Sequence, residues 1–187
     1  MLIRAATPAD IPALEQLIAA SARQLSVGHY DEAETEAAIA HVFGVDSELV
    51  EDGTYLIVES EGRLAGCGGW SRRATLFGSD RFAARASGYV DPAVAPAKIR
   101  AFFVAPEFAR RGIGTVLLKA CEDAAIAAGF RSAELMATLP GVPFYAARGY
   151  TAGSAITQSY EGIGVTFVPM HKPIHQPEEK RAQTING

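Results

Sequence analysis

The chain has 187 residues, of which 49% are hydrophobic and 20% charged, a composition typical of a soluble globular protein with one domain. Its net charge of −4 excludes the basic surface of a nucleic-acid-binding protein. No apolar run approaches the ~20 residues that span a bilayer, and no signal peptide is recognisable, so we expect no membrane partner.

The first half of the chain predicts a strand, two helices and a β-hairpin. Apolar residues at helical spacing indicate the helices, and Pro8 at a first helical position marks the start of the first. Two apolar runs around the turn Ser60-Glu61-Gly62 indicate the hairpin. These elements cover residues 2–5, 8–24, 31–43, 54–59 and 63–70. The following stretch, residues 72–96, has little periodicity, and a loop of that length inside a domain is usually functional.

The second half predicts a central strand, a long helix, a strand, a short helix and a closing hairpin. They cover residues 98–104, 112–128, 132–137, 140–148, 151–160 and 165–172. The long helix is expected to stop at Gly129 and to turn these residues toward the sheet: Ile113, Val116, Leu117, Ala120, Cys121, Ala124 and Ala127. The order of elements predicts an α/β (α+β) fold with a mixed sheet and helices on both faces. We expect one domain over residues 1–173 and a disordered tail over 174–187.

The cysteines and histidines do not indicate a metal site. Cys67 and Cys121 are isolated, which is typical of buried thiols in a reducing compartment and favours a cytoplasmic location. The minority interpretation is a catalytic nucleophile. His171 and His175 are four residues apart, but Pro173 between them breaks any helix. We therefore expect no metal cofactor.

The most informative segment is the turn between the central strand and the long helix, Ala109-Arg110-Arg111-Gly112-Ile113-Gly114. A helix that begins in such a turn leaves its first backbone N–H groups unpaired, and its dipole favours an anion there. The glycines allow a ligand close to the backbone. The segment lacks the Gly-Lys-Ser/Thr of a nucleotide-hydrolase P-loop, and Leu117 occupies the third-glycine position of a dinucleotide fingerprint. A phosphate cradle of another kind is predicted.

The segment resembles the acyl-CoA-binding motif of the GCN5-related N-acetyltransferase (GNAT) superfamily, Arg/Gln-x-x-Gly-x-Gly/Ala, with Ala109 departing from the pattern at the first position. Downstream, Pro143-Phe144-Tyr145-Ala146-Ala147-Arg148-Gly149-Tyr150 resembles the superfamily's Phe-Tyr-x-x-x-Gly-Phe signature. The resemblance covers roughly residues 1–173. It implies a mixed, mostly antiparallel central sheet of about seven strands flanked by about four helices.

The resemblance also implies roles for individual residues. It implies acetyl-CoA as cosubstrate and a small-molecule or peptide amine as acceptor, and homodimers are common among such proteins. Tyr145 is the expected general acid, because a phenol with a pKa near 10 is protonated at neutral pH and can donate to the leaving sulfur. The cofactor-binding set is Phe102, Phe103 and Val104 for the pantetheine arm, and Arg110, Arg111, Gly112, Ile113, Gly114 and Thr115 for the phosphates.

No general base is evident. Some relatives carry a glutamate early in the central strand, where this chain has Lys98-Ile99-Arg100. Glu134 is a candidate substitute, and deprotonation through water is an equal alternative. The leading hypothesis is direct transfer of an acetyl group to a primary amine. A non-catalytic acyl-CoA-binding regulatory domain is the alternative, and a nucleotide-binding protein is a third. We expect residues 72–96 to lie over the acceptor site and shape substrate choice.

The acceptor itself is not specified by these residues. The second predicted helix carries four carboxylates in its first turns, from Asp31 to Glu36. Carboxylates at a helix N-terminus stabilise the helix, which is the interpretation we prefer for most of them. Some of them could instead attract a cationic amine, and this favours a cationic small molecule as the acceptor.

Overall fold

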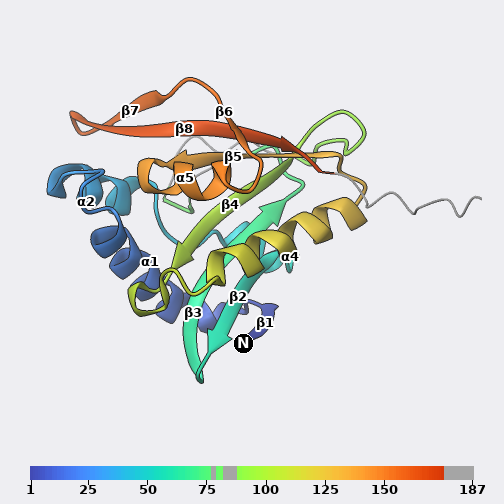
Figure 1. The fold of residues 1–187 in the computed structure, drawn as a ribbon, viewed down its shortest axis with the longest axis horizontal. Coiled ribbons are helices and arrows are strands. Elements are labelled where there is room, and N and C mark those ends of the chain that lie inside the picture. The colour runs from blue at the N-terminus through green and yellow to red at the C-terminus, as the bar shows by residue number, and fades with distance from the viewer. Residues whose placement is uncertain (77–78, 82–87, 175–187) are drawn as a thin grey trace, which may run out of the picture.

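The computed structural model describes residues 1–76, 79–81 and 88–174, which form eight strands and five α-helices (Figure 1). The strands are β1 (Leu2–Ala5), β2 (Tyr55–Ser60), β3 (Arg63–Ser71), β4 (Ala97–Val104), β5 (Ser132–Thr138), β6 (Thr151–Ala152), β7 (Ile156–Tyr160) and β8 (Ile163–Pro173). The helices are α1 (Ile11–Leu25), α2 (Glu32–His41), α3 (Ser47–Glu51), α4 (Ile113–Ala127) and α5 (Val142–Ala146). None of these helices is long and apolar enough to cross a membrane.

The strands form one sheet in the order β1-β2-β3-β4-β5-β8-β6, with β7 paired to β8. The described pairs are antiparallel except β4 with β5, which run parallel. This confirms the predicted mixed, mostly antiparallel sheet, although it has eight strands where about seven were expected. The predicted central strand, β4, does lie in the middle of the sheet.

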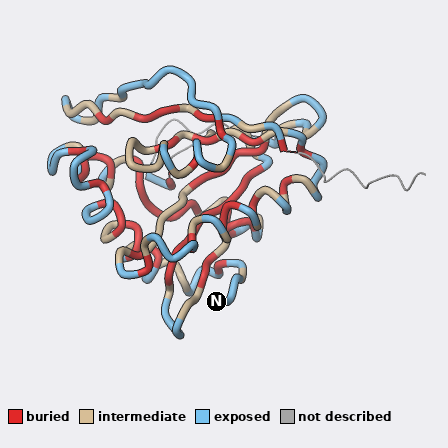
Figure 2. The backbone as a smooth tube through the Cα atoms, viewed as in Figure 1, coloured by how far each residue is buried: buried red, intermediate tan, exposed pale blue. Residues whose placement is uncertain are grey.

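Helices cover both faces of the sheet, as predicted. Buried side chains of α1, including Leu14, Leu17 and Ile18, pack on one face. Buried side chains of α4 and α5, including Cys121 and Tyr145, pack with β4 and β5 on the other. Figure 1 shows α4 crossing in front of the sheet, and Figure 2 shows the buried residues concentrated along the strands and the inner side of α4.

Glycines in β3 allow this close packing. A Cβ on Gly66 would lie 2.7 Å from the Ile113 side chain of α4, and one on Gly68 would lie 2.5 Å from the ring of Phe102. Both distances are shorter than real Cβ contacts, so only glycine fits beneath α4 and the Phe102 ring. The glycines of β3 therefore allow α4 to approach the sheet closely.

Three details differ from the predictions. Helix α3 was not predicted, because five residues are too few to display a helical period. In α4, Ala127 is exposed while Leu118 and Ala125 are buried, so the face turned to the sheet is rotated from the one expected. The segment predicted as one strand over 151–160 is divided into β6 and β7, which both pair with β8.

The chain ends outside the described residues. Ile174 is buried, and its N–H donates to the Arg131 carbonyl at 2.9 Å, so packing continues one residue beyond the expected domain limit. The rest of the predicted tail, residues 175–187, lies outside the described part of the chain. Cys67 and Cys121 are free, buried thiols, as predicted. Burial raises the pKa of the Cys67 thiol to about 12, which opposes a nucleophilic role.

Candidate active site

A β-bulge interrupts β4 at the centre of the sheet. Residues 100–103 of β4 lie opposite residues 67–69 of β3, so β4 carries one extra residue. Ala101 takes up the distortion with a positive φ of 55°, which costs a non-glycine residue on the order of 1–3 kcal/mol. The Tyr55 hydroxyl donates to the Ala101 carbonyl at 3.2 Å and holds the bulge in place. The bulge changes the direction of every side chain that follows it in β4.

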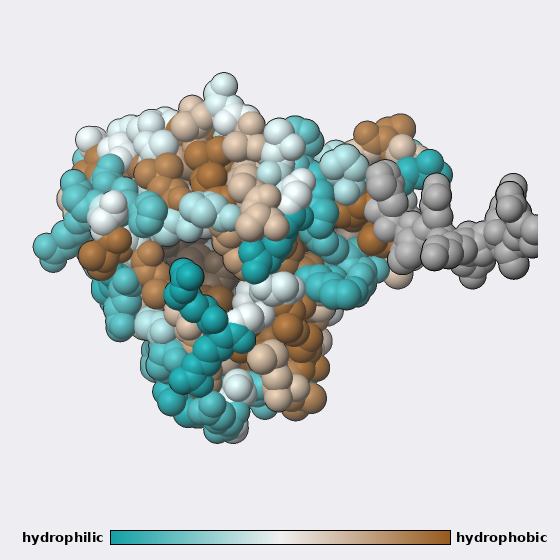
Figure 3. Space-filling model, in the orientation of Figure 1, coloured by the Kyte–Doolittle hydropathy of each residue, from teal (hydrophilic) through white to brown (hydrophobic). Residues whose placement is uncertain are grey.

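The bulge also separates β4 from β5. The two strands pair along residues 97–99 and 133–135, and the register of this pair ends there. A pocket lies at the opening, and the space-filling view shows a hollow with hydrophobic residues at its base (Figure 3). The pairing of β4 with β3 resumes after the bulge at Phe103 and Val104, while Phe102 lies within the bulge. The predicted role of Phe102, Phe103 and Val104, a backbone contact with an extended ligand, stays a prediction.

Most of the side chains that line the pocket are apolar or aromatic. Phe102 and Phe103 lie on opposite faces of β4: Phe102 packs edge-on to Tyr145, at 6.4 Å between ring centroids, and Phe103 packs edge-on to Phe43, at 5.4 Å. The pocket thus contacts both faces of the sheet where β4 and β5 part. Its lining residues are Val42, Phe43, Gly44, Ile99, Arg100, Ala101, Phe102, Phe103, Leu135, Met136, Thr138, Tyr145 and Phe167.

Helix α4 begins at the predicted phosphate cradle. Gly112 is its N-cap, with a left-handed φ of 85°, and Arg110 has a positive φ of 62°. The N–H groups of Ile113, Gly114 and Thr115 form the first turn, where an α-helix provides no intrahelical acceptor. The Ile113 side chain is buried, while Thr115 is exposed. These backbone positions match the predicted anion site, and their binding role stays a prediction.

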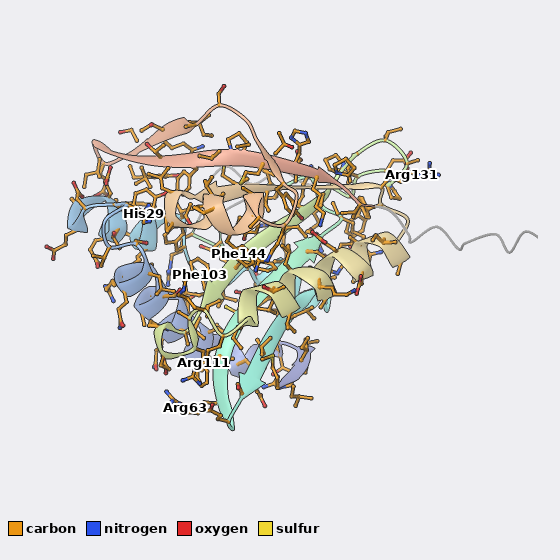
Figure 4. The ribbon with its side chains drawn as sticks, viewed as in Figure 1. His29, Arg63, Phe103, Arg111, Arg131 and Phe144 are labelled. Atoms are coloured by element: carbon orange, nitrogen blue, oxygen red, sulfur yellow. The ribbon has the colours of Figure 1, made fainter. Side chains whose placement is uncertain are left out.

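The two predicted phosphate-binding arginines are both exposed. Arg111 pairs with Glu61 at 3.0 Å and lies over the Phe108 ring, with its guanidinium carbon 5.2 Å from the centroid. An exposed ion pair of this kind contributes little to stability, so an incoming phosphate can replace it. Figure 4 shows Arg111 in the turn before α4 and Phe144 between α5 and the start of α4.

Tyr145, the predicted general acid, lies on α5 in a cluster of aromatic rings and lines the pocket. Its ring packs edge-on against Phe144, at 4.9 Å, and Tyr150, at 5.7 Å. Burial, and next the neighbouring Cys121, raise the pKa of its phenol above the usual value of about 10. The phenol therefore remains protonated at neutral pH, as a proton donor must.

The carboxylates near the pocket are engaged with cations. Glu134, the candidate base on β5, forms an ion pair with Lys98, its direct neighbour in the β4–β5 register. Asp46 forms an ion pair with Arg100, and the side chains of both are fully buried. Three of the four carboxylates at the start of α2 are occupied in other ways: Asp31 and Glu34 cap the helix reciprocally, and Glu36 pairs with Arg23.

Sequence reasoning missed two groups in this site. The bulge at Ala101 has no residue signature of its own, and the Gly68-Gly69 pair opposite it is the one local signal that could have pointed to unusual packing there. Arg148 was part of the second motif but received no role. Its Nη2 donates to the Thr115 hydroxyl in the first turn of α4, which places it beside the predicted cradle.

Replacing Gly112 by alanine is expected to weaken coenzyme A binding at least ~10-fold. A Cβ disfavours the left-handed conformation by roughly 1–2 kcal/mol and would pull the N-terminal amides out of line. Gly129 ends α4 with a similar φ of 94°, and a Cβ there meets Pro92 at an ordinary 3.8 Å. Gly129→Ala therefore carries the same backbone strain away from the cradle. Equal coenzyme A affinity of the two variants in calorimetry would contradict the assignment.

The comparisons with known proteins agree with this geometry. The model of the acetyltransferase (GNAT) family matches residues 14–150. The chain belongs to this family, which makes it an acyltransferase that uses acetyl-CoA. A comparison with curated protein sequences gave no match.

Solved structures share the fold at low identity. A GCN5-related N-acetyltransferase from Rhodopseudomonas palustris, also described as a class-II aminotransferase, superposes with a TM-score of 0.68 at 23% identity, covering 92% of this chain and 94% of its own. The PaiA N-acetyltransferase from Thermoplasma acidophilum, in complex with coenzyme A, gives 0.62 at 17%, covering 92% and 98%. YncA, a putative acetyltransferase from Salmonella typhimurium with acetyl-CoA, gives 0.61 at 16%, covering 97% and 98%.

Proposed function

We propose that this chain transfers the acetyl group of acetyl-CoA directly to a primary amine. The observation that carries the proposal is the opening between β4 and β5, with a protonated tyrosine that lines the pocket. The start of α4, with N–H groups that have no intrahelical acceptor, supports it. The diphosphate would rest on the amides of residues 110–115. The pantetheine arm would run along residues 102–104 toward Tyr145.

The chemistry is a nucleophilic substitution at the thioester carbonyl. The neutral amine nitrogen attacks this carbon, the carbonyl electrons move to oxygen, and their return breaks the C–S bond. Tyr145 donates its proton to the departing thiolate, the ammonium nitrogen loses one proton to water, and a proton from the solvent then restores the phenol of Tyr145. Holding both reactants in one opening supplies much of the acceleration, because it replaces an encounter in solution by a reaction within one complex.

The acceptor amine is expected to react in its neutral form without an ionised base beside it. Glu134 and Asp46, two carboxylates paired with residues of β4, are each occupied by a cation. The plot of kcat/KM against pH should therefore rise until it reaches the pKa of the acceptor amine used. Amines with lower pKa values should reach their plateau at lower pH.

The side of the pocket next to α2, where we place the acceptor, favours an amine attached to an apolar or aromatic group. Phe43 packs edge-on against Phe103 and Phe167, and this cluster lines the pocket on the α2 side. Three of the four carboxylates from Asp31 to Glu36 are used in capping and in the pair with Arg23, which weakens the case for a strongly cationic acceptor. A small-molecule or peptide amine with an apolar neighbour fits this lining.

Part of the loop over residues 72–96 contacts the segment that carries Phe43, on the α2 side of the pocket. Residues 77–78 and 82–87 of it lie outside the described part of the chain, but residues 79–81 contact the segment after α2. The Arg81 guanidinium donates to the carbonyls of Phe43 at 2.6 Å and Ile39 at 3.2 Å, and it pairs with Glu15. Glu15 in turn accepts the Val45 N–H at 2.7 Å.

Replacing Arg81 by alanine is therefore expected to raise the KM of the acceptor several-fold and to leave the KM of acetyl-CoA unchanged. The reason is that Phe43, which lines the acceptor side, loses the donor that holds its carbonyl. Arg131→Ala, at an exposed position beyond α4, serves as the control. An unchanged acceptor KM would show that the loop does not shape acceptor choice.

The experiment that tests the function is a turnover assay with acetyl-CoA and a panel of amines that includes arylalkylamines, amino acid amides, polyamines and peptides. Free thiol release that depends on an amine, with the acetylated amine found by mass spectrometry, is the expected result. Tight coenzyme A binding without transfer to any amine would instead favour the acyl-CoA-binding regulatory domain.

A further inference from the structure

Arg148 is a cation placed between the two motifs of the site. Its Nη2 donates to the Thr115 hydroxyl in the first turn of α4, and its Nη1 donates to the Phe144 carbonyl of α5 at 2.7 Å. Its guanidinium carbon lies 3.8 Å from the centroid of the Phe144 ring. That ring in turn packs against Gly114, where a Cβ would lie 3.0 Å from it. The Arg148 side chain thus contacts both α5 and the first turn of α4.

The charge of Arg148 has no carboxylate partner among the described residues. Its two acceptors, the Thr115 hydroxyl and the Phe144 carbonyl, are neutral. Its Nε is buried and has no acceptor among the described residues. A guanidinium has five N–H donors and binds phosphate oxygens in pairs, more strongly than it binds a neutral hydroxyl. The contact with the Phe144 ring and the hydrogen bond to Thr115 together hold the guanidinium beside the first turn of α4.

We propose that Arg148 binds the diphosphate of the acyl donor and that the Thr115 hydroxyl holds its guanidinium in position until the donor arrives. This inference rests on the proposed function, since it needs a diphosphate at the start of α4. On binding, Nη2 exchanges the neutral hydroxyl for a phosphate oxygen, while Nη1 stays on the Phe144 carbonyl. The exchange adds a third arginine to the site besides Arg110 and Arg111, and one that is already immobilised.

The test compares two donors across variants. Acetyl-CoA carries the diphosphate, and S-acetyl-pantetheine lacks it. Arg148→Gln is expected to lower kcat/KM with acetyl-CoA by about 10- to 100-fold, the effect of losing a charge-assisted hydrogen bond. With S-acetyl-pantetheine the loss should stay below about threefold. Arg148→Lys should recover part of the acetyl-CoA activity, and Arg131→Gln should behave as the wild type with both donors.

A second variant tests the exchange itself. Thr115→Val keeps the backbone N–H and removes the hydroxyl, so coenzyme A affinity in calorimetry should be equal to that of the wild type or higher. A loss of more than threefold would show that the hydroxyl binds the donor directly and would overturn the exchange. Circular dichroism and the melting temperature establish that each variant is folded.

The outcomes separate this inference from the proposed function. If Arg148→Gln loses equal activity with both donors, its role is structural and the inference is wrong. If the wild type uses both donors equally and shows no affinity for coenzyme A, the cradle at the start of α4 is wrong as well. A wild-type preference for acetyl-CoA over S-acetyl-pantetheine that Arg148→Gln reduces by about 10-fold or more supports the inference.

Discussion

Tyr145→Phe is expected to lower kcat by about 10²- to 10⁴-fold while coenzyme A binding stays unchanged. The substitution removes one oxygen from a ring that lines the pocket and packs edge-on against Phe102, Phe144 and Tyr150. The ring and its packing remain, so the loss reports the proton donated to the thiolate. Steady-state kinetics with the best acceptor, together with calorimetry of coenzyme A, measure the two quantities.

The pH dependence of this step has a definite sign. A phenol is charged only after it loses its proton, and burial disfavours the phenolate, so the pKa of Tyr145 lies above its usual value. The donor form is therefore present throughout the range below the ordinary phenol pKa of about 10. We expect kcat to show no decline up to that pH. A decline at lower pH that disappears in Tyr145→Phe would contradict the shift.

Tyr150→Phe provides the matched control. It removes the same atom from the same aromatic cluster, but the Tyr150 hydroxyl donates to Glu122 at 3.0 Å, and Tyr150 does not line the pocket. Its kcat should remain within a few-fold of the wild type. If both variants lose activity equally, the effect comes from packing of the cluster and not from a general acid.

Asp46→Ala is expected to lower the free energy of unfolding by about 3–5 kcal/mol. The side chains of Asp46 and its partner Arg100 are both fully buried, so removal of the carboxylate leaves a cation in the interior without its counter-ion. The pair joins the segment before α3 to β4 immediately before the bulge, and Arg100 lines the pocket. Urea denaturation measures the change.

Two further variants check this reasoning. Asp123→Ala breaks the ion pair with Lys119, in which the Lys119 side chain is 74% exposed and the Asp123 side chain 59%. Because the pair is exposed, its loss should lower the free energy of unfolding by well under ~1 kcal/mol. The double variant Asp46→Leu/Arg100→Leu should be less destabilised than the sum of the two single variants, because a buried ion pair can often be replaced by apolar residues. A cost for Asp46→Ala no larger than that for Asp123→Ala would refute the account of the pair.

The sequence predicted most elements because their signals are local. Helical spacing, caps and turn residues place the ends of α1, α2 and α4 within three residues of those observed, and both ends of β1 are as predicted. The turn at Gly112 and Gly114 was recognisable since glycine, arginine and a following apolar helix are adjacent in the chain. The exposed Ala127 was misplaced because the face of α4 depends on where the sheet lies beneath it.

The features that shape the pocket depend on contacts between distant segments. The bulge at Ala101 is defined by the register of β4 against β3, which no local pattern encodes. The Asp46–Arg100 pair and the contact of Arg148 with Thr115 join residues that are far apart in the sequence. The sequence shows that these side chains are charged or polar, but it does not show which of them contact one another.

The central claim is that the backbone amides at the start of α4 grip the diphosphate of coenzyme A. Isothermal titration of the folded protein with coenzyme A, and in parallel with pantetheine, tests it most directly. The account predicts binding of coenzyme A that is at least ~10-fold tighter than that of pantetheine and that weakens in Gly112→Ala. Absence of binding, or equal affinity for the two ligands, would contradict it.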